Sequence, residues 1–221
     1  MRVALYYAPA LPDPLWRAGC AWLGRDPETA AAVPQPAVAG IHEATAEARI
    51  YGLHCTLKPP MHLAASYSAF LADTEELAAS RTPFPLPPLA VADLSGFLAL
   101  RETEPCPALH ALADACVMGV DRHRAAPDVA ELARRRRNGL SVAQETNLRL
   151  WGYPGVLGLW RFHMTLTRRL TDAERTVFRP AAEAHFAAAL AQPRQVSSIC
   201  VFTQPAPGTP FRIAERLPLG G

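Results

Sequence analysis

Short apolar runs alternate along the chain with segments of helical periodicity, which predicts a mixed α+β protein. The runs that read as strands are 2–8, 51–58, 89–94, 96–101, 160–167, 195–203 and 211–217. The segments with helical spacing are 15–23, a possible short helix at 41–48, 66–80, 107–120, 128–137, 141–150 and 171–190. We expect Pro59 and Pro60 to stop the second strand, and the prolines at 83–88 to form a linker.

The order of these elements repeats in part, because each half of the chain offers a strand with a histidine, then a helix, then a strand pair. This order predicts a duplicated, two-lobed α+β fold, with antiparallel sheets lining a central cleft and helices outside. We expect residues 1–221 to form a single bilobal domain. One lobe would hold the strand around 51–58 and the other the strand around 160–167.

The same four-residue pattern, His-x-Thr-Leu, occurs in both of these strands. It reads His54-Cys55-Thr56-Leu57 in the first and His163-Met164-Thr165-Leu166 in the second, 109 residues apart (163 − 54). Residues i and i+2 of a strand point to the same face, so each motif presents an imidazole beside a hydroxyl. One such histidine is usually a hydrogen-bonded core residue, but two in matching contexts favour one composite site.

Other residues near the motifs are weaker candidates for binding a substrate. Lys58 lies four residues after His54 and Thr167 occupies the matching place in the second motif, so both would share the face of the motif. Trp151 and Tyr153 could stack on a base or sugar, and Tyr6 could form a cleft wall. The ordinary alternatives are a solvated strand-end lysine and aromatic rings packed in the core. The run 134–137, four arginines, reads as a solvated helix end or as a contact for phosphate or an RNA backbone.

Composition narrows the class of protein and of partner. With 221 residues, 50% hydrophobic and 19% charged, the chain suits one globular unit with a full core. A net charge of +2 disfavours a strong nucleic-acid binder and fits a small anion or a short RNA end. Five scattered cysteines without a Cys-x-x-Cys pair disfavour a zinc knuckle and fit a reduced cytoplasm. We expect no signal peptide, no membrane span, no metal and no cofactor; the oligomeric state stays open.

The paired motifs, their spacing and the order of elements resemble the 2H phosphoesterase superfamily. More narrowly, Tyr6-Tyr-Ala-Pro9, the segment 51–60, Trp151-Gly-Tyr-Pro154 and the segment 162–167 resemble an uncharacterised bacterial branch encoded with carbon–phosphorus lyase genes of phosphonate metabolism. The resemblance implies a metal-independent phosphoesterase with His54 and His163 as the acid/base pair.

Two histidines can take opposite roles in phosphodiester cleavage, and Thr56 and Thr165 can bind the non-bridging oxygens. We assign His163 as the base and His54 as the acid. The substrate would be a small phosphorylated molecule, such as a ribose cyclic phosphate, or a nucleotide or RNA 2′,3′-cyclic phosphate end. The direction, hydrolysis or ligation, stays open. The alternative is a non-catalytic nucleotide- or phosphosugar-binding accessory protein of phosphonate utilisation. A metal hydrolase is disfavoured because no acidic residue partners either motif.

Overall fold

A computed structural model describes residues 1–220; Gly221, the last residue of the expected domain, lies outside the described residues. The strands are β1 (Arg2–Tyr7), β2 (Cys55–His62), β3 (Phe84–Leu86), β4 (Leu89–Leu94), β5 (Phe97–Glu102), β6 (Met164–Arg169), β7 (Arg194–Val196), β8 (Ser198–Gln204) and β9 (Arg212–Pro218). The helices are α1 (Pro14–Leu23), α2 (Ile41–Ala44), α3 (Ala46–Arg49), α4 (Tyr67–Ala79), α5 (Pro107–Gly119), α6 (Val129–Arg136), α7 (Val142–Trp151) and α8 (Asp172–Leu190), with 3-10 turns at Asp121–His123 and Leu157–Leu159.

Seven antiparallel strands form one sheet in the order β4-β5-β6-β2-β1-β8-β9, and β3 pairs with β7 in a separate ribbon. A single residue pair, Cys55 with Met164, joins β2 to β6 at the centre. The sheet therefore has two parts, β4-β5-β6 and β2-β1-β8-β9, and the predicted α+β class with antiparallel strands is confirmed.

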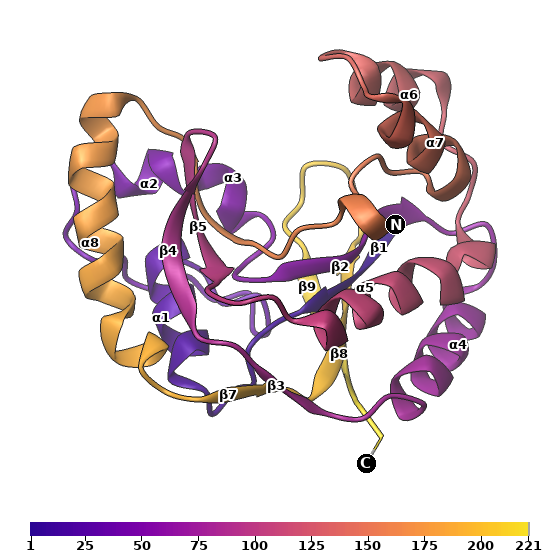
Figure 1. The fold of residues 1–221 in the computed structure, drawn as a ribbon, viewed down its shortest axis with the longest axis horizontal. Helices are drawn as coiled ribbons and strands as arrows, with labels where there is room; N and C mark the ends of the chain where they lie inside the picture. The colour runs from indigo at the N-terminus through magenta and orange to yellow at the C-terminus, as the bar shows by residue number, and fades with distance from the viewer. Residues whose placement is uncertain (221) are drawn as a thin grey trace.

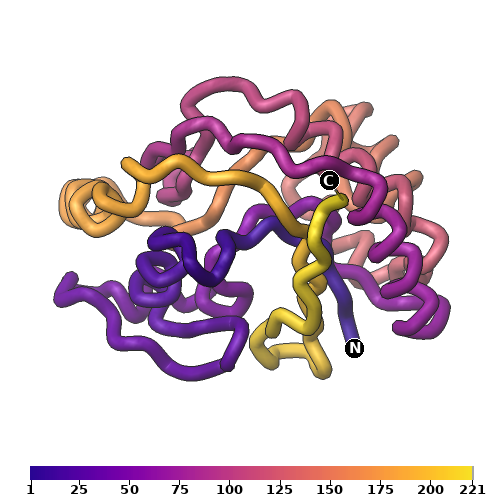
Figure 2. The backbone as a smooth tube through the Cα atoms, turned by 90° about the horizontal axis from the view of Figure 1, so that it is seen from below, coloured from indigo at the N-terminus to yellow at the C-terminus, as the bar shows by residue number. Residues whose placement is uncertain are grey.

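The two halves of the chain exchange their strand pairs. The hairpin β4–β5 follows the first motif along the chain but pairs with β6, the strand of the second motif. The hairpin β8–β9 follows the second motif but pairs with β1, beside the first motif. Figure 2 shows this exchange as the last strands, in yellow, running beside the first segment, in indigo. Each part of the sheet thus contains residues from both halves of the sequence.

Helices cover the sheet at its two sides (Figure 1). Helices α1 and α8 pack together and α8 also contacts β4, whereas α5 packs on β2 and α4 contacts both α5 and β9. Helices α6 and α7 form an arm that stands apart from these layers (Figure 1); α6 buries no side chain, and Leu148 is the one buried residue of α7. Capping residues fix where several of the helices begin. At α8, for example, Thr171 and Glu174 form a capping box at the N-terminus.

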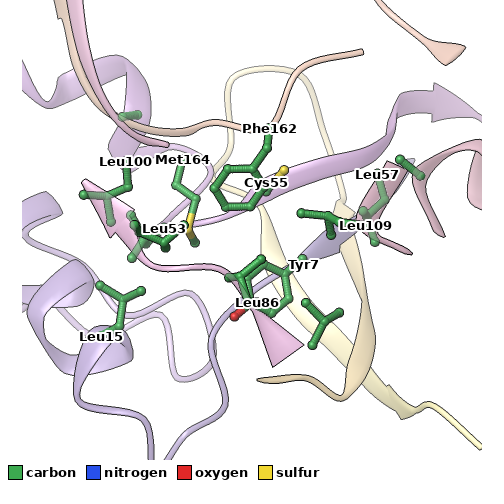
Figure 3. Close-up of a cluster of buried hydrophobic side chains, with 14 of the residues drawn as sticks. Tyr7, Leu15, Leu53, Cys55, Leu57, Leu86, Leu100, Leu109, Phe162 and Met164 are labelled. Carbon is green, nitrogen blue, oxygen red and sulfur yellow. The ribbon is translucent and has the colours of Figure 1, made fainter. Parts of the chain in front are cut away.

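The core explains which face each motif presents. Cys55 and Leu57 of β2 and Phe162 and Met164 at β6 are fully buried, and Figure 3 shows all four within one hydrophobic cluster. Each buried Leu or Phe contributes about 2 kcal/mol of hydrophobic stabilisation. Because side chains alternate along a strand, the histidine and threonine of each motif lie on the opposite face from this cluster.

Three expectations about boundaries were wrong. Strand β2 does not stop at Pro59-Pro60 but continues to His62. The two prolines occupy an irregular stretch opposite β1, where the register shifts, so neither needs to donate a ladder hydrogen bond. The predicted linker at 83–88 contains β3, and the predicted strand at 195–203 divides at Ser197, because its first residues pair with β3 rather than with the main sheet.

Candidate functional site

The two motifs meet where β2 joins β6. His54 and His163 each come directly before the residue that makes the central pair, Cys55 with Met164. In this antiparallel register the motifs are related by a two-fold axis through the pair, which sets each histidine beside the threonine of the other motif. All four side chains line one cavity of about 440 Å³, a volume typical of small-molecule sites.

Both imidazoles are held in the same way. The Nδ1 of His54 donates to the carbonyl oxygen of Gly52, and the Nδ1 of His163 donates to that of Arg161, each at 2.9 Å. A carbonyl oxygen only accepts, so the proton of each neutral ring lies on Nδ1. The Nε2 of each ring is left to exchange a proton with a ligand in the cavity.

A glycine before the first motif makes this arrangement possible. Gly52 has φ +79°, and a Cβ built at this position would lie 2.6 Å from the ring of Pro27. A larger residue would therefore strain the turn that supports His54. The sequence analysis did not identify Gly52 as a site residue. The signal that could have identified it is that a glycine stands two residues before His54.

Aromatic rings surround His54. The ring of Tyr6 stacks on the imidazole at 4.0 Å between centroids with an interplanar angle of 27°, and the Tyr51 and Phe202 rings lie at 5.6 and 6.2 Å. This burial lowers the pKa of His54 from 6.5 to about 4; the Gly52 carbonyl opposes the shift and nearby His163 adds to it. His54 is therefore neutral at pH 7 in the unliganded protein.

The threonine of the first motif is already engaged with its histidine. The hydroxyl of Thr56 lies 3.3 Å from Nε2 of His54 and donates to it, since the neutral ring has no proton there. The backbone oxygen of Thr56 accepts from the indole of Trp160 at 2.7 Å. Trp160, which sequence reasoning did not single out, thus ties the segment before the second motif to the strand of the first.

Lys58 does not share the face of His54, contrary to expectation. Its Nζ is buried and donates to Asp121 at 2.6 Å and to the Val117 carbonyl at 3.0 Å, beneath the sheet. The register of β1 and β2 shifts between Tyr6, which faces Thr56, and the preceding residue of β1, which faces Lys58. This bulge breaks the alternation after Thr56 and turns Lys58 into the protein.

Thr167 also leaves the face of its motif. It is buried, and its hydroxyl accepts from the backbone N–H of Leu98 at 3.0 Å. A register shift between β5 and β6 lies at this point, so the hydroxyl replaces a missing ladder hydrogen bond. Neither Thr167 nor Trp151, which ends α7, lines the cavity.

Tyr6 and Tyr153 do line the cavity, together with charged residues. The lining includes the guanidinium groups of Arg2, Arg134 and Arg135 and one carboxylate, Glu47. The run of arginines predicted as a helix end therefore contributes two members to the site.

The described part of the chain shows neither a cluster of metal ligands nor a membrane-spanning helix. Among residues 1–220, no group of three or more His, Cys, Asp or Glu side chains is placed to hold a metal ion. Within the same part of the chain, no helix combines the length and apolarity needed to cross a bilayer.

Similar proteins in bacteria carry a kinase name. The chain is 38% identical over 231 residues to the ribose 1,5-bisphosphate phosphokinase PhnN of Janthinobacterium sp. (strain Marseille), covering 100% of this chain and 51% of that protein. It is also 38% identical to the protein of that name from Laribacter hongkongensis (strain HLHK9), covering 97% of this chain and 51% of that one. The chain thus spans about half the length of these relatives.

Solved structures similar to this chain include a crystal structure of a phosphoesterase, with a TM-score of 0.45, 14% identity, and coverage of 100% of this chain and 99% of that one. Another is E. coli LigT complexed with 3′-AMP, with a TM-score of 0.44, 13% identity, and coverage of 100% and 98%. A family model described as "Protein of unknown function (DUF1045)" matches residues 56–212, most of the chain. The chain therefore belongs to the DUF1045 family.

Proposed function

We propose that this protein is a metal-independent phosphodiesterase that hydrolyses a cyclic phosphate by acid/base catalysis with two histidines, the whole chain acting as one bilobal unit. One observation carries the proposal: two imidazoles, each held through Nδ1, expose Nε2 to one cavity beside two threonine hydroxyls. This set of groups can accept a proton, donate a proton and bind the oxygens of a phosphate.

The surroundings of the two rings divide the roles. His54 is neutral because of its aromatic surroundings, so its Nε2 takes a proton from water as the water oxygen attacks phosphorus. His163, protonated at Nε2, donates that proton to the sugar oxygen as its bond to phosphorus breaks. The product is a phosphomonoester with a free hydroxyl. This assignment reverses the one favoured by sequence alone, which did not foresee the stacking of Tyr6 on His54.

The threonines bind the phosphate in this scheme. Thr165 can donate its hydroxyl to a non-bridging oxygen, where negative charge increases during the reaction. Thr56 donates to Nε2 of His54 in the unliganded protein, so its hydroxyl must rotate toward the phosphate when substrate arrives. The rotation frees Nε2 to receive the proton from water.

The motifs resemble those of 2H phosphoesterases, which supports a phosphodiester substrate. The names of the relatives support a phosphorylated ribose as the core of that substrate. Their kinase activity is not carried over to this chain. Lys58 is its only lysine and follows Leu57, so the sequence contains no Gly-Lys-Ser/Thr of a phosphate-binding loop.

A substrate panel with matched variants tests the proposal. The protein is incubated with EDTA and nucleoside 2′,3′-cyclic phosphates, 2′,5′-linked dinucleotides and ribose 1,2-cyclic phosphate. We expect turnover of at least one cyclic phosphate by the wild type and a loss of about 100-fold or more in His54→Ala and in His163→Ala. His62→Ala is the control, because this exposed histidine ends the same strand as the first motif.

Three outcomes would count against the proposal. Turnover that survives both motif variants would exclude paired-histidine catalysis, and turnover abolished by EDTA would exclude metal independence. Binding of nucleotides without turnover of any substrate would instead favour the accessory binding protein.

A further inference from the structure

The cavity contains more positive charge than two-histidine chemistry uses. Arg2 of β1 and Arg134 and Arg135 of α6 line the same cavity as His54 and His163. None of the three guanidinium groups has a role in proton transfer or in holding the reacting phosphate as proposed above. Three cations that line one ligand cavity point to a further anionic group on the ligand.

Nearby carboxylates leave much of this charge uncompensated. Glu131 pairs closely with Arg135, at 2.6 Å, but lies 3.9 Å from Arg134, whose side chain is 61% exposed. Arg2 donates its Nε to the neutral side chain of Gln204, and its guanidinium lies over the ring of Phe211, so its two printed partners are uncharged. Glu47 is the single acidic residue of the lining.

Arg135 is also held in place before a ligand arrives. Its guanidinium lies over the ring of Tyr153, 4.6 Å from the centroid, and Glu131 fixes its other side. The side chain is 15% exposed, so little conformational freedom remains to be lost on binding. Tyr153, which could also stack on a base or sugar, supports this arginine with one face of its ring.

The size of the cavity allows a ligand that reaches from the motifs to α6. Its volume of about 440 Å³ lies in the range that encloses whole metabolites, rather than a single phosphate group. The lining includes the motifs at β2 and β6 and also two residues of α6 in the arm, which Figure 1 shows apart from the main layers.

We propose that Arg134 and Arg135, supported by Tyr153, form a second phosphate subsite, so that the substrate is a cyclic phosphate whose sugar carries another phosphate. The inference rests on the function proposed above for the cyclic phosphate itself. Arginine binds phosphate through several charge-assisted hydrogen bonds, each stronger than a neutral one. The second phosphate thereby selects phosphorylated sugars or nucleotides over their unphosphorylated analogues.

Paired ligands measure the subsite directly. Calorimetry compares the binding of adenosine 3′-phosphate with that of adenosine 3′,5′-bisphosphate, and kinetics compare adenosine 2′,3′-cyclic phosphate with and without a 5′-phosphate. We expect the wild type to prefer the doubly phosphorylated member of each pair by about tenfold or more. In the variant Arg134→Gln/Arg135→Gln the preference should fall to about twofold. Arg137→Gln, an exposed arginine at the end of α6 that does not line the cavity, should keep it.

The readouts separate this inference from the proposed function. Turnover without any preference for the 5′-phosphate, or a preference that survives the double variant, would overturn the subsite and leave the phosphodiesterase standing. A calorimetric preference that the double variant loses, in a protein that turns over no cyclic phosphate, would support the subsite and overturn the phosphodiesterase. A dinucleotide ending in a 2′,3′-cyclic phosphate is a third ligand; if it bound more tightly than the 5′-phosphate monoester, the second phosphate would be that of an RNA chain.

Discussion

The partly buried imidazole of His54 makes the stability of this protein depend on pH. Its pKa falls from 6.5 in an unfolded chain to about 4 in the folded protein, chiefly because burial disfavours the charged ring. The unfolded state therefore takes up a proton at a pH where the folded state does not. The stabilisation is fully present above pH 6.5 and is lost as the pH falls toward 4. Between pH 8 and pH 5 the loss from this one residue is about 2 kcal/mol.

The variant His54→Asn tests this magnitude. Asparagine keeps a donor for the Gly52 carbonyl but does not titrate, so the variant should lose about 2 kcal/mol less than the wild type between pH 8 and pH 5. Urea unfolding at both pH values measures the difference. His62→Asn serves as the matched control and should follow the wild type.

A direct titration of the ring by NMR decides whether the reasoning is right. If the His54 resonance titrates near its ordinary pKa, or if wild type and His54→Asn lose equal stability, burial by Tyr6 and its neighbours does not keep this imidazole neutral. The assignment of His54 as the base would then lose its physical basis.

Three further changes have expected outcomes. Asp121→Ala leaves the buried Lys58 ammonium without its carboxylate and should cost about 3 kcal/mol by urea unfolding, more than Lys58→Met, which removes the buried charge itself. Thr167→Val leaves a backbone N–H of β5 unpaired and should cost about 1 to 3 kcal/mol, while kcat/KM stays unchanged because the hydroxyl is outside the cavity. Gly52→Ala forces a side chain into a left-handed turn and should lower the melting temperature by several degrees. It should also reduce kcat, because the carbonyl that holds His54 moves. Equal kcat in the wild type and the variant would refute the link between this turn and catalysis.

Most of the fold was predictable from local signals. Apolar runs located the strands of the main sheet, and helical spacing located the helices, because both depend on residues close together in sequence. The exchange of strand pairs between the halves was not predictable in this way. Pairing of β4–β5 with β6 depends on contacts between residues far apart in the chain, and the repeated order of elements is compatible with either arrangement.

The residues of the candidate site were likewise predictable where they depend on local patterns and not where they depend on strand pairing. Alternation placed Thr56 and Thr165 correctly beside their histidines, because it holds over two residues of a strand. It failed at Lys58 and Thr167, two residues further on, because both strands change register after the threonine. Bulges arise from the fit to a neighbouring strand, which the sequence of β2 or β6 alone does not specify. Arg134 and Arg135 line the same cavity because of where the α6–α7 arm stands, which the sequence of α6 alone does not specify.

The burial of Lys58 has a consequence for the chemistry of the surface. All other basic side chains except the histidines are arginines, so no lysine amine lies on the surface of the folded chain. Amine-acylating reagents should therefore leave the side chains of folded molecules unmodified. Acylation of Lys58 would require β2 to separate from α5, so its rate would report how often that part of the molecule opens.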